Sequence, residues 1–129
     1  MIKGLNHLTL ATGNLERGVA FYRDVLGLEL AKQWDGGAYL SAGSLWLCLS
    51  PDKGTAPSSD YTHFALDVDE KDFAPMKDRI LAADADLWKT NGSEGASLYF
   101  CDPDGHQLEL HVGTLETRLA AMNLEPAQC

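Results

Sequence analysis

Two histidines and one glutamate have the types and spacing that could hold a catalytic metal ion. His7 lies in Gly4–Leu10 and His63 in Asp60–Leu66, two alternating segments that resemble each other at an offset of 56 residues, with histidine matching histidine. Glu109 stands between two leucines in a strand-like run, where a carboxylate is costly unless it is paired or bound to a metal. Two imidazoles and a carboxylate suit Mn²⁺, Fe²⁺, Zn²⁺ or Ni²⁺.

The last strands of the two halves can also be aligned, Gly43–Leu49 with Gly105–His111. In this alignment Leu47 corresponds to Glu109. The repeat then provides four equivalent ligand positions, which are occupied by His7, His63, Glu109 and Leu47. Three ligands and one open side are what a catalytic metal requires.

Alternatives to this triad remain open. Each histidine could be an ordinary half-buried strand residue. His111 is two residues from Glu109 and therefore on the same strand face, which makes it the main rival ligand. His106 falls in a turn and is expected to be solvated.

The two halves of the chain also share the same predicted order of strands and helices, and these elements must position the two histidines and the glutamate. Helical apolar stripes follow the first strands, from an Asn14 cap to about Gly27 and from an Asp69 cap to about Ala83. Three short strands then follow in each half, expected at Leu28–Trp34, Ala38–Ala42 and Leu45–Ser50, and at Asp86–Lys89, Ala96–Cys101 and Gln107–Val112.

The sequence therefore predicts an α+β fold of two paired βαβββ modules, whose curved mixed sheet surrounds a metal site. We expect one domain over residues 1–129, with module one at about 1–50, a linker at 51–59, module two at about 60–113 and a C-terminal helix at 114–122.

Composition narrows the classes of partner. The net charge of −9 argues against nucleic acid and anionic membranes as partners. No apolar run is long enough to span a bilayer and no signal-peptide pattern is present, so a cytoplasmic location is expected. Three widely spaced cysteines argue against a disulfide framework. From Ile80 to Cys129 the only Lys or Arg residues are Lys89 and Arg118, which makes them the candidates for holding an anion.

Several motifs resemble those of the vicinal oxygen chelate superfamily, which has the glyoxalase fold: Gly4–Leu10, Trp46–Ser50, Asp60–His63 and Asp102–His111. Within it, the stretch Trp88–Phe100 is similar to the fosfomycin-resistance glutathione transferases. The resemblance covers about residues 1–122. It implies a Mn²⁺-dependent enzyme that adds glutathione to the epoxide of fosfomycin and so confers antibiotic resistance.

The resemblance also implies roles for single residues. It makes His7, His63 and Glu109 the metal ligands and Thr9 and Tyr39 catalytic residues. It implies a homodimer with exchanged modules, in which one subunit gives His7 to a site and the other gives His63 and Glu109. Lys89, Ser93, Tyr99 and Arg118 match the phosphonate-binding positions of that family. The full set of implied roles is substrate binding by Thr9, Trp46, Lys89, Ser93, Ser97, Tyr99 and Arg118, potassium binding by Asn91, Ser93, Glu94, Gly95 and Ser97, and thiol binding by Trp34, Tyr39 and Cys48.

The chain departs from this pattern at a few places. Gly92 stands where many relatives carry Arg, Phe64 stands where Tyr is usual, and the tail after Met122 diverges. Related epoxide hydratases carry a Glu base where this chain has Gly36 and Gly37, which favours thiol transfer over addition of water. Other hypotheses are a different metalloenzyme of the same fold, such as an extradiol dioxygenase or a glyoxalase-like isomerase, and a non-catalytic binding module for a small drug.

Overall fold

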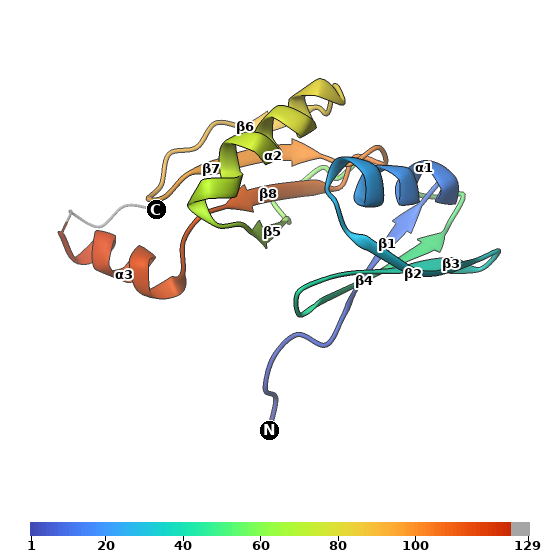
Figure 1. Cartoon of the computed structure of the whole chain (residues 1–129), viewed down its shortest axis with the longest axis horizontal. Coiled ribbons are helices and arrows are strands. Elements are labelled where there is room, and N and C mark those ends of the chain that lie inside the picture. The colour runs from blue at the N-terminus through green and yellow to red at the C-terminus, as the bar shows by residue number, and fades with distance from the viewer. Residues whose placement is uncertain (125–129) are drawn as a thin grey trace. The chain divides into compact units, whose positions relative to one another are not determined.

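Two four-stranded mixed sheets with their helices make up the computed structural model, which describes residues 1–124 (Figure 1). The predicted order β-α-β-β-β, twice, is confirmed. The elements are β1 Leu8–Thr12, α1 Leu15–Ala20, the π-helical turn η1 Phe21–Val25, β2 Glu29–Trp34, β3 Gly37–Ala42, β4 Leu45–Pro51, β5 Phe64–Asp67, α2 Glu70–Ala82, β6 Leu87–Lys89, β7 Ser97–Cys101, β8 Gln107–His111 and α3 Leu115–Leu124.

The chain divides into two compact units. The first comprises Met1–Ser58 together with the turn Asp102–Gly105, and the second comprises Ser59–Cys101 and the chain from His106 onward. No helix among residues 1–124 is long and apolar enough to cross a membrane. Cys48 and Cys101 form no disulfide. Cys129 lies outside the described residues.

In the first unit the strand order is β1-β4-β3-β2, with β1 parallel to β4 and the other pairs antiparallel. The Asn14 side chain accepts a hydrogen bond from Arg17 N at 3.0 Å, so the predicted helix cap is confirmed. The helix has changed to π geometry by Phe21, and Gly27 follows its end with a φ of 80°. Leucines from β1, β3 and β4 form the core beneath these helices (Leu10, Leu40, Leu47 and Leu49).

In the second unit the order is β5-β8-β7-β6, with β5 parallel to β8. Ile80 of α2 is fully buried, as are Phe100 and Leu108 of the sheet beside it. Asp69 occupies the cap position of α2, as predicted, although its side chain makes no capping hydrogen bond.

Both histidines precede their strands and do not lie within them. We predicted strands from Gly4 and Asp60, but β1 begins at Leu8 and β5 at Phe64. The reason is that strand pairing with the neighbouring β4 and β8 starts only at these residues. His7 and His63 are therefore held at the entrance of each sheet.

The strand registers correct the predicted match between the halves. Thr9 pairs with Cys48, and Ala65, its equivalent 56 residues later, pairs with Glu109. Cys48, and not Leu47, therefore occupies the place of Glu109. Leu47 is 1% exposed and belongs to the core. A shift of one residue moves every side chain of a strand to the other face, so the prediction that Leu47 fills the fourth place was wrong.

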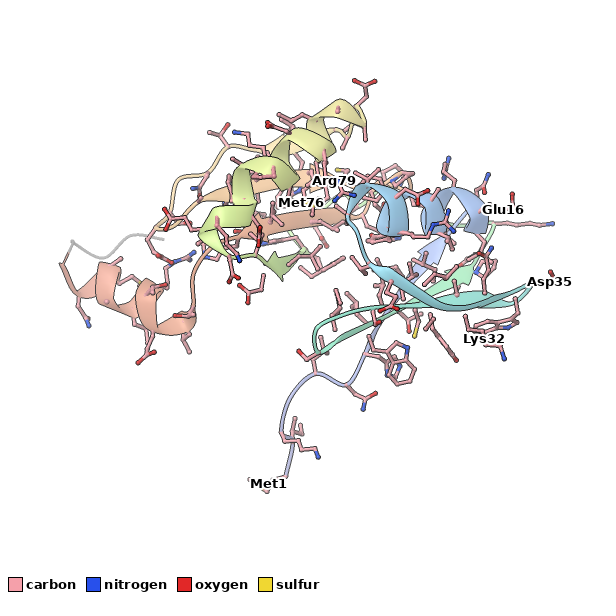
Figure 2. The ribbon with its side chains drawn as sticks, viewed as in Figure 1. Met1, Glu16, Lys32, Asp35, Met76 and Arg79 are labelled. Carbon is pink, nitrogen blue, oxygen red and sulfur yellow. The ribbon has the colours of Figure 1, made fainter. Side chains whose placement is uncertain are left out.

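The positions of the two units also match in the remaining strands. Tyr39 of β3 pairs with Cys48, and Tyr99 of β7 pairs with Glu109. In the edge strands, Lys32 of β2 pairs with Tyr39, and Lys89 of β6 pairs with Tyr99. An irregularity immediately precedes both lysines in the register. Figure 2 shows Lys32 on the side of the first sheet away from α1, the side that Tyr39 shares with it. Each unit therefore presents a matched row of side chains on one sheet face: Thr9, Cys48, Tyr39 and Lys32 in the first, and Ala65, Glu109, Tyr99 and Lys89 in the second.

The Asp102–Gly105 turn is fixed to the first unit by polar contacts. The Tyr22 hydroxyl donates to Asp102 Oδ2 at 2.7 Å, and both residues are buried. Arg17 Nη2 and Gly13 N both donate to Asp104 Oδ1, at 2.9 and 2.8 Å. Burial and the neighbouring Asp102 carboxylate raise the pKa of Tyr22 well above its ordinary value.

Candidate metal and anion site

His63 and Glu109 form the centre of the candidate metal site. His63 Nε2 lies 3.3 Å from Glu109 Oε1, and the Glu109 side chain is 8% exposed. His63 Nδ1 lies 2.9 Å from the carbonyl oxygen of Tyr61. Because a carbonyl oxygen can only accept, Nδ1 is the donor in this contact, and the ring turns Nε2 toward the carboxylate. An imidazole nitrogen and a carboxylate oxygen held side by side are atoms that divalent cations bind, so these residues fit a metal.

His7, the third predicted ligand, lies in the first unit. Its exposed ring packs against Trp46 with the ring centroids 4.5 Å apart, and its Nδ1 lies 2.7 Å from Asn6 Oδ1. Within residues 1–124 of one chain, no three His, Cys, Asp or Glu side chains gather as a metal-binding group. The structure therefore brings two of the three predicted ligands together and holds His7 on a separate unit.

Behind Glu109, Ser97 connects the carboxylate to His111. Ser97 Oγ lies 2.6 Å from Glu109 Oε2 and 2.6 Å from His111 Nδ1. His111 Nε2 lies 3.7 Å from Glu94 Oε1. The predicted rival ligand His111 thus directs its Nδ1 to Ser97 at 2.6 Å and lies 3.4 Å from Glu109 Oε2, whereas His63 contacts the other carboxylate oxygen, Oε1.

Lys89 lies on the same sheet face as Glu109. Register places Lys89, Tyr99 and Glu109 in one row across β6, β7 and β8. Lys89 Nζ hydrogen-bonds to the Tyr61 hydroxyl and lies 4.7 and 4.9 Å from the ring centroids of Tyr61 and Tyr99. The hydrogen bond that Lys89 donates to the Tyr61 hydroxyl raises the pKa of Lys89, so the ammonium stays charged at neutral pH.

Arg118, the second predicted anion-binding cation, is held by an acidic partner. Its Nε donates to Glu94 Oε1 at 3.0 Å and its Nη2 donates to Ser93 Oγ at 3.3 Å. The Arg118 side chain is 38% exposed. A guanidinium has five N–H donors in a planar fork, so it can serve Glu94 and an incoming oxyanion together.

The loop predicted to bind potassium is closed by its own hydrogen bonds. Asn91 Nδ2 donates to Gly95 O at 2.9 Å, and Ser93 N donates to Asn91 Oδ1 at 3.2 Å. The Glu94 carboxylate is paired with Arg118. Three oxygens of the loop, Asn91 Oδ1, Glu94 Oε1 and Gly95 O, accept hydrogen bonds from protein donors. Potassium binding stays a prediction.

The residues predicted to meet the thiol and the epoxide share one face of the first sheet. Thr9, Cys48 and Tyr39 form a row across β1, β4 and β3. Trp46 and Trp34 pack edge-on against the Tyr39 ring, with ring centroids 5.5 and 4.9 Å from it. The three aromatic side chains are 38–40% exposed, which leaves an apolar surface open to a ligand.

The sequence analysis missed two residues that surround His63. The Trp88 ring lies 5.1 Å from the His63 ring, and its Nε1 donates to Leu108 O at 3.0 Å. Tyr61 contacts His63 both through its carbonyl oxygen and through its ring, at 4.9 Å. Tyr61 lies two residues before His63, a spacing that could have drawn attention to it. The sequence pattern could not show on which face of the sheet Trp88 lies, because the register irregularity in β6 interrupts the alternation of side chains there.

With this geometry in place, comparison with known proteins assigns the chain to a family. The chain belongs to the Glyoxalase/Bleomycin resistance protein/Dioxygenase superfamily, whose sequence model matches residues 4–110. The resemblance to the fosfomycin-resistance proteins of this superfamily is confirmed by individual relatives.

Three relatives illustrate this. The chain is 52% identical over 130 residues to glutathione transferase FosA of Serratia marcescens, covering 98% of this chain and 92% of that protein. It is 35% identical to metallothiol transferase FosB of Staphylococcus haemolyticus, over 93% of this chain and 91% of that one. The fosfomycin resistance protein FosX of Listeria monocytogenes, solved with Mn(II) and sulfate, superposes with a TM-score of 0.82 at 30% identity, covering 93% and 98% of the two chains.

Proposed function

We propose that this protein is a divalent-metal-dependent transferase that adds glutathione to the epoxide of fosfomycin and thereby inactivates the antibiotic. The observation that carries the proposal is the 52% identity to glutathione transferase FosA over nearly the whole chain. The lower identity of 35% to metallothiol transferase FosB favours glutathione over another thiol.

Mn²⁺ is the metal we propose, since the FosX structure holds Mn(II). His63 Nε2 and Glu109 Oε1 would bind it, and His7 would complete the triad. When bound, the metal would supply a Lewis acid for the oxygen of the opening epoxide. Tyr61 and Trp88 hold the His63 ring, and Ser97 holds the other Glu109 oxygen, so both ligands are oriented before a metal binds.

We infer that a site is shared between two copies of the chain, with His7 supplied by one and His63 and Glu109 by the other. This inference is supported by the placing of His7 on one unit and the His63–Glu109 pair on the other. Complementation tests it. A His7→Ala chain and a Glu109→Ala chain should each be inactive alone, but refolded together they should give mixed dimers with one intact site and one doubly damaged site, and so recover activity. Mixtures that stay inactive would contradict shared sites.

Lys89, Tyr99 and Arg118 are the groups we propose for the phosphonate, with Ser93, Ser97 and Trp46 around it. A phosphonate dianion must be bound against a net protein charge of −9, so it needs local cations. The Tyr61 hydroxyl anchors the Lys89 ammonium, which limits the entropy lost when the anion binds.

In the reaction, the thiolate sulfur forms a bond to an epoxide carbon while the bond from that carbon to oxygen breaks. The oxygen then takes up a proton from water, which balances the proton that the thiol lost to solvent on forming the thiolate. Thr9 would donate a hydrogen bond to that oxygen, and Tyr39 and Trp34 would line the approach of the thiol beside Cys48. The matched row of Thr9, Cys48 and Tyr39 on one sheet face supports this arrangement.

Mass spectrometry tests the proposal directly. Mn²⁺-loaded protein is mixed with glutathione and fosfomycin, and the adduct is followed against a protein-free control. Glu109→Gln should abolish the enzymatic rate, while Glu29→Gln, at an exposed strand position, should leave it unchanged. Running cysteine in parallel reports the thiol preference. Absence of adduct, together with oxygen uptake on catechols or turnover of methylglyoxal, would favour the dioxygenase or isomerase alternative.

A further inference from the structure

We propose that His111 is a positioning residue for the metal ligand Glu109, acting through the hydroxyl of Ser97. This inference rests on the proposed metal site but not on the identity of the thiol or the epoxide. It assigns His111 a role that differs from the direct ligation considered in the sequence analysis.

The direction of the hydrogen bonds follows from counting protons. Glu109 Oε2 can only accept, so the single proton of Ser97 Oγ points to it across 2.6 Å. The other 2.6 Å contact of Ser97 Oγ must then be accepted by Ser97 and donated by His111 Nδ1. His111 thus prevents the hydroxyl from rotating away, and the hydroxyl fixes the carboxylate so that Oε1 faces His63 Nε2.

The surroundings of the His111 ring accommodate an imidazole tightly. A Cβ on Gly113 would lie 2.8 Å from His111 Nε2, and a Cβ on Gly95 would lie 3.1 Å from His111 Cε1. Both glycines adopt positive φ, at 146° and 77°. Two residues without side chains therefore leave the space that the ring occupies, on the strand position paired with Ser97.

The far side of the ring keeps a second carboxylate away from the metal ligands. His111 Nε2 lies 3.7 Å from Glu94 Oε1, and that oxygen accepts from Arg118 Nε at 3.0 Å. The ring thereby separates Glu109, held by Ser97, from Glu94, held by Arg118. His111 Nδ1 also lies 3.4 Å from Glu109 Oε2, so the ring stands between the two carboxylates, and Glu109 is the one that contacts His63.

Mn²⁺ binding, measured from the electron paramagnetic resonance signal of the free ion without thiol or fosfomycin, tests the proposal. His111→Leu should weaken Mn²⁺ binding about 10- to 100-fold, the range typical for loss of a group that orients a metal ligand. His111→Asn should stay within about threefold of the original protein, because its amide can donate from nearly the position of Nδ1. His106→Leu, a histidine removed from the turn before β8, is the matched control.

A double-variant cycle separates positioning from a general structural effect. Ser97→Ala should weaken Mn²⁺ binding as much as His111→Leu, and combining the two should add nothing further. Normal Mn²⁺ binding by His111→Leu would overturn the proposal, and so would losses that add in the double variant. Mn²⁺ binding by His111→Asn as weak as that of His111→Leu would also overturn it, because this result indicates direct ligation. Circular dichroism of each variant shows that it is folded. A protein that follows this pattern but forms no fosfomycin adduct would leave this inference standing and refute the proposed function.

Discussion

Replacing Tyr22 by Phe removes the hydroxyl that ties the Asp102–Gly105 turn to the first unit. The hydroxyl donates at 2.7 Å to Asp102 Oδ2, and the two residues are 1% and 5% exposed. The ring itself is kept, so no cavity forms. A hydrogen bond to a charged partner contributes about 1.5–3 kcal/mol, and we expect a loss of about 2 kcal/mol in the free energy of unfolding.

This loss converts into a measurable change in melting temperature. The entropy of unfolding is about 2.1 cal/mol/K per residue, so for 129 residues a loss of about 2 kcal/mol lowers the Tm by about 7 °C. Urea unfolding followed by circular dichroism gives the free energy directly, and a thermal scan gives the Tm. Tyr61→Phe is the matched control, because Tyr61 is 58% exposed and its hydroxyl should contribute less than about 1 kcal/mol.

The stability lost in Tyr22→Phe should depend on pH. Burial raises the pKa of Tyr22 above its ordinary value of 10.0, so the folded protein holds this proton more tightly than the unfolded chain. The stability that Tyr22 contributes is therefore complete below about pH 10 and is lost above it, by up to about 1.4 kcal/mol per pH unit. The difference between the original protein and Tyr22→Phe should shrink above about pH 10. A pH-independent difference, or one below about 0.5 kcal/mol at pH 7, would refute the reasoning.

Three further predictions follow from the same contacts. Lys89→Met should raise the KM for fosfomycin at least about tenfold in a steady-state assay, because it removes a charge-assisted contact, whereas Lys53→Met at an exposed loop position should not. Gly95→Ala should destabilise the protein by about 1–3 kcal/mol in a thermal scan, since the added Cβ would lie 2.3 Å from Val112 O at a φ of 77°; an unchanged Tm would show that the loop relaxes freely. Leu40→Ala, at 0% exposure in the first sheet, should cost about 2–5 kcal/mol in urea unfolding, and a smaller cost would mean that the core collapses around the gap.

Several features of the fold and site were predictable because they depend on local patterns. Alternating apolar residues predicted the strands, the Asn14 cap predicted the start of the first helix, and a carboxylate between leucines identified Glu109 as a residue that needs a partner. The match of His7 with His63 required only comparison of the chain with itself. The isolated cations Lys89 and Arg118 were likewise visible in the sequence alone.

The tertiary structure decided the pairing across the sheets. Cys48 replaced Leu47 as the counterpart of Glu109, because register is set by hydrogen bonds between distant strands and a single residue of slip reverses the face. The alternation of residue types along one strand does not reveal a register irregularity such as the one beside Trp88, because the irregularity arises from pairing with another strand. His111 changed from a rival ligand to a partner of Ser97 for the same reason. Ser97 lies 14 residues from His111 along the chain, and the two become adjacent only when β7 pairs with β8.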